Sequence, residues 1–340
     1  MKHLIWAAVL VAGLGTGPSR AASVGERAST APTTDPTLAA LRARVSAAAA
    51  EGRAHVGLAA IDLASGQMVS VNGGERFPMA STVKIAIAGT FLHGVEKGRL
   101  DLDSYYFLPR PGRSARAAAA GGRPGRELID LMLTRSDNHA ADVLLHAVGG
   151  TEAVEQWLKS AGVVGQRMDR SIAQLLSDRQ AVKRVRVGHG RHRRWMEVAV
   201  PRATSPGDQR DSSTPEAMAA LLVKLRDGKL LDGIRTSYLF DVMSRCRTGP
   251  NRIRGQLPPG TPVAHKTGTL DGVTDDVGIV NLPNGHQLAI AVFERGPGGV
   301  AAHDRSIALL SRMLYDGFSS AATEQRNAGG PPSWPWGIAR

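Results

Sequence analysis

Apolar residues recur at two different periods along the chain, and the places where the period changes divide it into three blocks. In the first block, apolar positions follow helical spacing over 38–50. Two short runs of strand-forming residues follow at 55–63 and 67–71, and the small residues between them at 64–66 favour a hairpin. The first block therefore predicts one helix and two antiparallel strands.

Helical spacing dominates the second block, from Ser81 to about Arg226, where strand signals largely vanish. Its last helix is the best delimited: Thr214 suits the cap, Pro215 suits the first turn and Gly228 ends the pattern. The other predicted helices of this block begin at Ser81 or cover 126–134, 140–148 and 151–161.

The third block returns to strands, and the Asn284-Gly285 pair is a strong hairpin signal between the last two. Its predicted elements are a helix at 237–245, strands at 261–266, 277–282 and 287–293, and a helix at 302–318. Strands at both chain ends around a helical middle predict an α/β (α+β) fold. We expect an antiparallel sheet of about five strands built from both chain ends with flanking helices, plus an inserted all-helical domain, with an active site at the seam.

The first 22 residues have the pattern of a cleaved secretory signal. A short basic start at Lys2 precedes an apolar core over 4–14, which is too short to span a bilayer. We therefore expect a secreted or periplasmic protein without a transmembrane helix. The predicted organisation is a signal peptide at 1–22, a sheet-containing domain at 38–75 and 228–320, an all-helical domain at 76–227 with a basic insertion at about 177–204, and a disordered tail at 321–340.

The formal net charge of +12 raises the question of a polyanionic partner. Export argues against nucleic acid, so an anionic envelope surface is the better complement, and a basic surface that contacts only water is the alternative. Cys246 is the only cysteine, which excludes an intrachain disulfide and a cysteine-based zinc site. We expect no cofactor, no metal ion and a monomeric protein.

Ser81 and Lys84 are the first candidate catalytic residues. Their spacing places both on one face of a helix, where an amine can take the proton of a hydroxyl that is otherwise a weak nucleophile. The first helical turn also offers free backbone N–H groups to developing negative charge. The pair alone is not specific, because Ser-x-x-Lys occurs by chance in roughly every second chain of this length.

Two further motifs make the pattern specific, Ser136-Asp137-Asn138 between predicted helices and Lys266-Thr267-Gly268-Thr269 at the end of a predicted strand. With Ser81-x-x-Lys84 they resemble the class A β-lactamases, within the penicillin-recognising serine enzymes that include D-Ala-D-Ala peptidases. The likeness extends from about Leu38 to Phe318. It also includes the motifs Phe77-Pro78-Met79, Arg167-Met168-Asp169-Arg170 and the segment 207–215.

The resemblance implies a catalytic role for four residues. Ser81 would attack a lactam or peptide carbonyl, and Lys84 would take part in removing its proton. Ser136 would relay a proton to the departing nitrogen. Lys266 would keep the region of Ser136 electropositive and attract the carboxylate of the substrate.

The resemblance also implies how substrate is held. Asn138 would bind the side-chain amide of the substrate and orient Lys84, while the backbone N–H groups of Ser81 and Thr269 would form an oxyanion hole. Arg252 matches a position where some members place a carboxylate-binding arginine, with a surface charge as the alternative. The implied substrate-binding residues are Asn138, Thr267, Gly268, Thr269 and Arg252.

Four other residues receive structural interpretations. Arg170 and Asp211 match a buried ion pair that fixes the loop bordering the site. Asp137 is interpreted as a turn residue rather than a catalyst, and His265 as a polar residue at a strand edge rather than a ligand.

The likeness fails at the step that breaks the ester. The family uses a glutamate two residues after the Asp-Arg pair to activate water, and here that position is Ile172. The asparagine expected to help hold the water is replaced by Leu176. Since isoleucine cannot accept a proton, we expect impaired deacylation. Glu197, in the basic insertion, is an alternative as a displaced base, against an exposed loop acid.

Three readings of function remain open. The first is a class A β-lactamase-like hydrolase that forms an acyl-Ser81 ester with β-lactams. The second is a D-Ala-D-Ala carboxypeptidase or transacylase that acts on wall peptides. The third is a β-lactam or peptidoglycan sensor without turnover, in which the basic insertion docks on a partner.

Overall fold

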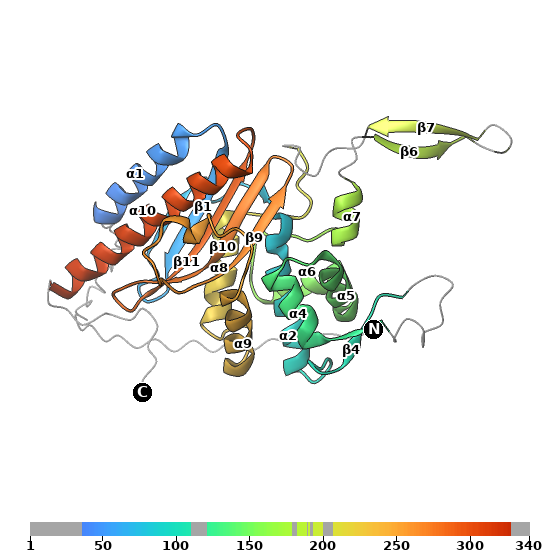
Figure 1. Ribbon diagram of the computed structural model, residues 1–340, viewed down its shortest axis with the longest axis horizontal. Coiled ribbons are helices and arrows are strands. Elements are labelled where there is room, and N and C mark those ends of the chain that lie inside the picture. The colour runs from blue at the N-terminus through green and yellow to red at the C-terminus, as the bar shows by residue number, and fades with distance from the viewer. Residues whose placement is uncertain are drawn as a thin grey trace, which may run out of the picture. The chain divides into compact units, whose positions relative to one another are not determined.

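The computed structural model describes residues 36–109, 121–178, 182–188, 190, 193–199 and 207–327. The described residues belong to one compact unit. Its centre is a five-stranded antiparallel sheet with strand order β2-β1-β11-β10-β9 (Figure 1). The strands are β1 (His55–Asp62), β2 (Met68–Val71), β9 (Val263–Leu270), β10 (Val273–Asn281) and β11 (Gln287–Arg295). The predicted fold class, with a sheet built from both chain ends, is confirmed.

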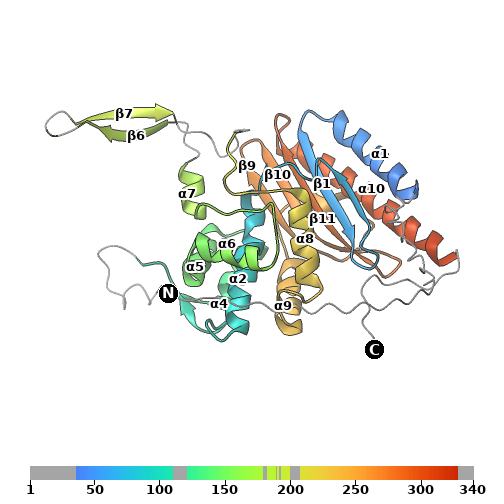
Figure 2. The same ribbon diagram turned by 180° about the vertical axis from the view of Figure 1, so that it is seen from behind.

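Helices cover both faces of this sheet. The terminal helices α1 (Pro36–Glu51) and α10 (Val300–Asn327) lie side by side on one face, and α8 (Pro215–Arg226) and α9 (Gly233–Ser244) lie on the other (Figures 1 and 2). Alternate residues of β11 therefore enter two separate apolar clusters, as the two-residue period of a strand requires. Leu288, Ile290 and Val292 face α1 and α10, whereas Ala289, Ala291 and Phe293 face α8.

The helical block packs around α2 (Lys84–Glu96), which follows one short 3-10 helix, η1 (Ala80–Val83). Ten of the residues of α2 are buried, so this helix is enclosed on nearly every side. The surrounding elements are α4 (Gly125–Thr134), α5 (Asn138–Val148), α6 (Thr151–Ser160) and α7 (Ile172–Ser177). The small elements are η3 (Ile253–Gln256) and the strand pairs β3 (Phe77–Pro78) with β8 (Ser212–Ser213) and β4 (Tyr105–Tyr106) with β5 (Arg123–Pro124).

Several elements depart from the sequence prediction: α7 was not predicted, and Ser81 lies in η1 rather than in the first turn of α2. The Lys266-Thr267-Gly268 motif lies inside β9 rather than at its end, and α9 begins at Gly233 because Asp232 caps it by accepting from the Arg235 N–H. The helix α10 continues to Asn327, beyond the predicted start of a disordered tail. The insertion, predicted within an all-helical block, holds a hairpin of β6 (Val182–Val187) and β7 (Arg194–Ala199).

The predicted signal peptide and residues 328–340 lie outside the described residues. In the part of the chain that is described, no helix is both long enough and apolar enough to cross a bilayer.

Candidate active site

Ser81 lies in the η1 turn immediately before α2, one turn ahead of Lys84. The backbone N–H of Lys84 donates to the carbonyl oxygens of Ser81 and Thr82, so the turn leads directly into the helix. Ala80, the preceding residue, has a φ of 44°, in the left-handed region that residues other than glycine rarely adopt. The chain is thus held in an unfavourable conformation directly beside the candidate nucleophile.

The ammonium group of Lys84 is fully buried and has three oxygen partners. Its Nζ lies 2.7 Å from the Ser136 carbonyl oxygen, 2.7 Å from Asn138 Oδ1 and 3.1 Å from Ser136 Oγ. Burial, reinforced by the positive charge of Lys266, lowers the pKa of Lys84 to about 7. The neutral form of Lys84 is therefore accessible near neutral pH, and a neutral amine that donates to two oxygens keeps a lone pair for an incoming proton.

Ser136 lies between two lysines. Its Oγ is 3.1 Å from Lys84 Nζ and 3.0 Å from Lys266 Nζ. If both amines donate, both lone pairs of the hydroxyl oxygen are used and its own proton is available to a third group. Ser136 has a left-handed φ of 58° in the short connection between α4 and α5. This geometry suits a proton relay between the two amines.

In the same connection, Asp137 caps the following helix and Asn138 contacts Lys84. The Asp137 side chain caps α5 by accepting from the Ala140 N–H at 2.7 Å, which confirms its interpretation as a turn residue. Asn138 is exposed apart from its contact with Lys84, so its amide is accessible from solvent.

Strand β9 brings Lys266 to the other side of Ser136. Lys266 is fully buried, also donates to the Thr267 carbonyl oxygen at 2.8 Å, and has a pKa lowered by burial to about 8. Close approach depends on Gly268, where a Cβ would lie 2.8 Å from the Met79 carbonyl oxygen and 3.1 Å from the Ala80 Cβ. A side chain at this position would push the strand away from the segment that precedes Ser81.

Arg252 is buried, so the surface-charge alternative is wrong. Its guanidinium donates to the carbonyl oxygens of Gly268 (2.8 Å) and Asp275 (2.9 Å) and to Thr269 Oγ1 (2.8 Å), and its Nε pairs with Asp304 at 2.7 Å. These contacts fasten β9 and β10 beneath the exposed Thr269 hydroxyl. The positive charge therefore supports the part of β9 where substrate would lie.

Known proteins are similar to most of the chain in sequence and in fold. Residues 40–318 match the model of the beta-lactamase enzyme family. Beta-lactamase AST-1 of Nocardia asteroides is 31% identical over 270 residues, which are 77% of this chain and 79% of AST-1. Extended-spectrum beta-lactamase PER-1 of Pseudomonas aeruginosa is 29% identical over 238 residues, 66% of this chain and 69% of PER-1. A solved class A β-lactamase reconstructed as the last common ancestor of Gram-negative bacteria has a TM-score of 0.68 at 30% identity, covering 82% of this chain and 99% of its own.

The chain belongs to the class A β-lactamase family. The resemblance predicted from the three motifs is confirmed, and the family supports hydrolase activity. The described structure places Lys84, Ser136, Asn138 and Lys266 in one hydrogen-bonded cluster and packs β9 against the turn that holds Ser81.

This β-lactamase-family chain has an apolar side chain at position 172, where the resemblance leads us to expect a water-activating glutamate. Ile172 is 3% exposed, belongs to the main apolar cluster and is the first residue of α7. A capping box formed by Ser171 and Gln174 starts that helix. The Asp142 carboxylate accepts from the backbone N–H groups of Ile172 (2.7 Å) and Ala173 (2.9 Å). The start of α7 is thus fixed in place, with a side chain that cannot accept a proton.

Glu197 lies in β7, where its side chain is 64% exposed and faces Arg184 of β6 at 3.6 Å. Figures 1 and 2 show this hairpin projecting beyond α7. This placement matches the alternative of an exposed acid and gives no support to Glu197 as a displaced base.

The predicted ion pair that fixes the loop is confirmed. Arg170 Nε lies 2.6 Å from Asp211 Oδ2, and both residues are buried. The other oxygen of Asp211 accepts from the backbone N–H groups of Asp169 (2.8 Å) and Arg170 (2.9 Å). One carboxylate therefore holds the start of the loop that leads to α7.

Sequence reasoning missed a polar network behind β9. Thr248 Oγ1 lies 2.6 Å from Thr267 Oγ1 and 3.3 Å from Cys246 Sγ. His265 lies in β9, the edge strand of the sheet, but its side chain is fully buried, and Asp276 pairs with its Nδ1 at 2.8 Å. Burial opposes the charged imidazolium, but Asp276 raises the pKa of His265 to about 9. No periodicity or spacing in the sequence relates these side chains, since they meet only across the folded sheet.

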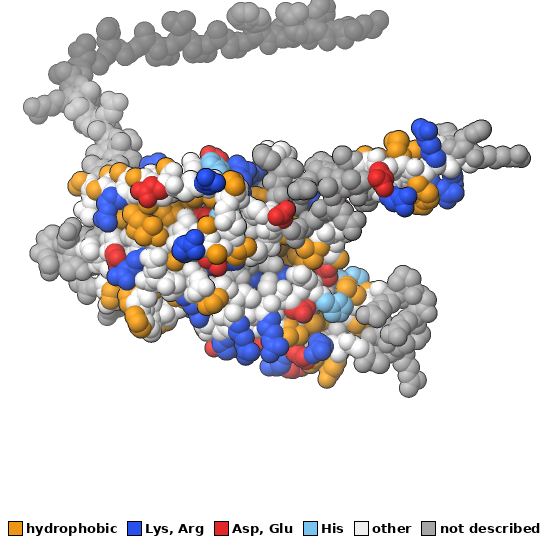
Figure 3. All heavy atoms as spheres, turned by 45° about the horizontal axis from the view of Figure 1, so that its top comes forward, with side chains coloured by type: hydrophobic (Ala, Val, Ile, Leu, Met, Phe, Trp, Pro, Cys, Tyr) orange, Lys and Arg blue, Asp and Glu red, His pale blue; other side chains and the backbone are white. Residues whose placement is uncertain are grey.

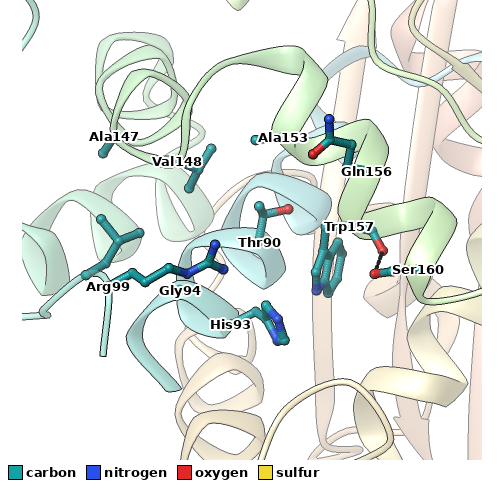
Figure 4. A pocket seen from close by; sticks show the side chains of 11 residues that line it. Thr90, His93, Gly94, Arg99, Ala147, Val148, Ala153, Gln156, Trp157 and Ser160 are labelled. Atoms are coloured by element: carbon teal, nitrogen blue, oxygen red, sulfur yellow. Dashed lines mark hydrogen bonds between the residues drawn. The ribbon is translucent and has the colours of Figure 1, made fainter. Parts of the chain in front are cut away.

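Two cavities among the described residues lie away from this cluster. One of about 460 Å³ lies beside the far half of α2, lined by Thr90, His93, Arg99 and Trp157 among others (Figure 4). Thr90 and His93 follow Lys84 by about one and a half to two and a half helical turns, about 9–14 Å along the axis. No group of three His, Cys, Asp or Glu side chains in the described ranges is arranged to hold a metal ion.

Proposed function

We propose that the protein is acylated at Ser81 by β-lactams. Lys84 removes the hydroxyl proton, Ser136 passes a proton to the lactam nitrogen, and Lys266 attracts the substrate carboxylate. The observation that carries this proposal is the chain Lys84–Ser136–Lys266, with both contacts to the Ser136 hydroxyl at hydrogen-bonding distance. A pKa near 7 gives Lys84 the neutral form that a base needs without making it too weak.

We further propose that the acyl-enzyme is hydrolysed slowly. Ile172 occupies the position from which the family activates water. Its buried aliphatic side chain offers no group there that can accept a proton from water. General-base catalysis is commonly worth about 10²–10⁴-fold in rate, so deacylation is expected to lag acylation by that order. The protein would then retain a β-lactam rather than destroy many molecules of it.

One experiment tests both steps. Protein is mixed with excess chromogenic cephalosporin, and colour and intact mass are followed together. We expect a burst close to one equivalent and a mass adduct that persists, and Ser81→Ala should show neither. Sustained rapid colour without an adduct would refute slow deacylation, and absence of both signals would refute acylation.

Export is a separate proposal that rests on the pattern of the first 22 residues alone. If it is correct, protein recovered from the cell envelope begins near residue 23. A cytoplasmic, uncleaved product would contradict it.

A further inference from the structure

The β6–β7 hairpin has two chemically different faces. In an antiparallel pair, residues directly opposite each other share a face. One face joins Arg184 to Glu197 and Arg186 to Trp195, whereas the other joins Val185 to Met196. The second face continues with Val198 opposite Lys183 and with Val187 opposite Arg194, so its centre is apolar and each end carries a basic residue.

Both faces are open to solvent. Trp195 is 64% exposed, Met196 43% and Val198 38%, so three large apolar side chains of one short strand are exposed together. Arg184, Arg186, Arg193 and Arg194 are exposed as well, against the single acid Glu197. Figure 3 shows these basic and apolar side chains together on the projecting hairpin.

We propose that this hairpin docks on an anionic lipid surface. The interfacial layer on each side of a bilayer is about 5–7 Å thick, comparable with the thickness of a single β-ribbon. The apolar centre of the Val185–Met196 face can rest on the acyl chains, while Arg194 at the end of that face and Arg184 and Arg186 on the opposite face remain among the phosphates. Trp195 beside Arg186 suits the boundary between these layers, where indole rings are favoured.

The apolar face distinguishes lipid from other polyanions. A wall polymer or nucleic acid would be bound by the arginines alone and would leave Val185, Met196 and Val198 in water. Lipid binding gives these side chains an apolar environment and also explains why they lie exposed in a free-standing ribbon. The inference does not depend on the acyl-enzyme proposal, because none of these residues belongs to the catalytic cluster.

The first test compares charge variants of the full chain. Sedimentation with vesicles of phosphatidylcholine containing about 30% phosphatidylglycerol measures the partition coefficient. A variant with Arg184, Arg186, Arg193 and Arg194 replaced by Gln should bind several hundredfold more weakly, since each cation near an anionic bilayer contributes about fivefold. A matched variant with Arg42, Arg44, Arg53 and Arg305, four exposed arginines elsewhere, replaced by Gln should lose less than about tenfold.

The second test separates lipid from a general polyanion. Trp195→Ser with Met196→Ser should weaken vesicle binding by about tenfold or more and leave binding to dextran sulfate unchanged. Vesicles should also shift the tryptophan emission of the parent to shorter wavelength, and Trp195→Phe should abolish most of that shift. Equal losses in the two arginine variants, or vesicle binding that the Trp195/Met196 variant retains in full, would overturn the proposal. Thermal denaturation should give every variant the unfolding midpoint of the parent, which reports correct folding.

Discussion

Replacing Ile172 by Glu should convert slow ester release into turnover. Ile172 is the first residue of α7, and its backbone N–H is already fixed by Asp142, so the new side chain would start from a defined position. The helix N-terminus stabilises a carboxylate there by about 0.3–1 kcal/mol. Burial and the neighbouring Asp142 charge would raise the pKa of the new glutamate, which brings it closer to the range of an effective general base.

The expected gain is about 10²–10⁴-fold in the deacylation rate, equivalent to about 3–5 kcal/mol of barrier. A value near the lower limit is expected for the single variant, because Leu176, one turn along the same helix face, cannot help hold water. Adding Leu176→Asn should therefore increase the rate further. The cost is about 1–3 kcal/mol of folding stability, as a buried aliphatic side chain is lost and the helix terminus recovers part of it.

Decay of the mass adduct after removal of free β-lactam measures the deacylation rate directly. Ile172→Gln is the matched control, because it has similar size and polarity to Glu but no basic group. We expect fast decay only in the glutamate variant. Equal decay in the two variants, with thermal denaturation showing both folded, would mean that position 172 does not face the acyl bond and that the proposed cause of slow release is wrong.

Three further predictions concern the lysines, Arg252 and Cys246. The second-order acylation rate should rise with pH through about 7 as Lys84 loses its proton and fall above about 8 as Lys266 loses its charge, and Lys266→Arg should remove the alkaline fall. A rate that is flat from pH 6 to 9 would contradict this assignment, given those pKa values of about 7 and 8. Arg252→Ala should lower the free energy of unfolding by about 3–5 kcal/mol, because Asp304 loses this buried partner and the Gly268 carbonyl loses its donor. Denaturant unfolding measures this, and a midpoint equal to that of the parent would show that the Arg252 contacts do not stabilise the fold. Burial raises the pKa of the Cys246 thiol, but the neighbouring His265 lowers it to about 7. The thiolate absorbance should therefore titrate near neutrality, and in His265→Asn the titration midpoint should rise by roughly one pH unit or more. An unchanged midpoint would exclude His265 as the cause.

The order of helices and strands could be predicted from the sequence because local signals repeat along it. The Thr214 cap, the Asn284-Gly285 turn and the apolar spacing over 38–50 each depend on neighbours within a few residues. The β6–β7 hairpin was missed although valine alternates with arginine over 184–187, because that strand signal covers only a short run inside a block whose other signals are helical. Asp232 offered a cap signal for α9 that the apolar pattern alone did not reveal.

The site was predictable to the extent that its motifs are compact in sequence. Lys84, Ser136 and Lys266 were identified because each belongs to a recognisable triplet. Asp142 and Thr248 have no such context, since each acts on a residue at least 19 positions away across the fold. The capping box at Ser171 and Gln174 was a readable signal for the start of α7, and it would have placed Ile172 at a helix N-terminus from the sequence alone.

The left-handed backbone at Ala80 and Ser136 has a consequence for how this protein tolerates change. Each such residue costs roughly 1–2 kcal/mol compared with a conformation that L-amino acids prefer. Glycine at position 80 would relieve that cost without removing a functional group, so heat resistance can be improved there independently of the chemistry. At position 136 the same replacement would remove the hydroxyl between the two amines. The conformational cost at Ser136 therefore cannot be removed without losing the proposed proton relay.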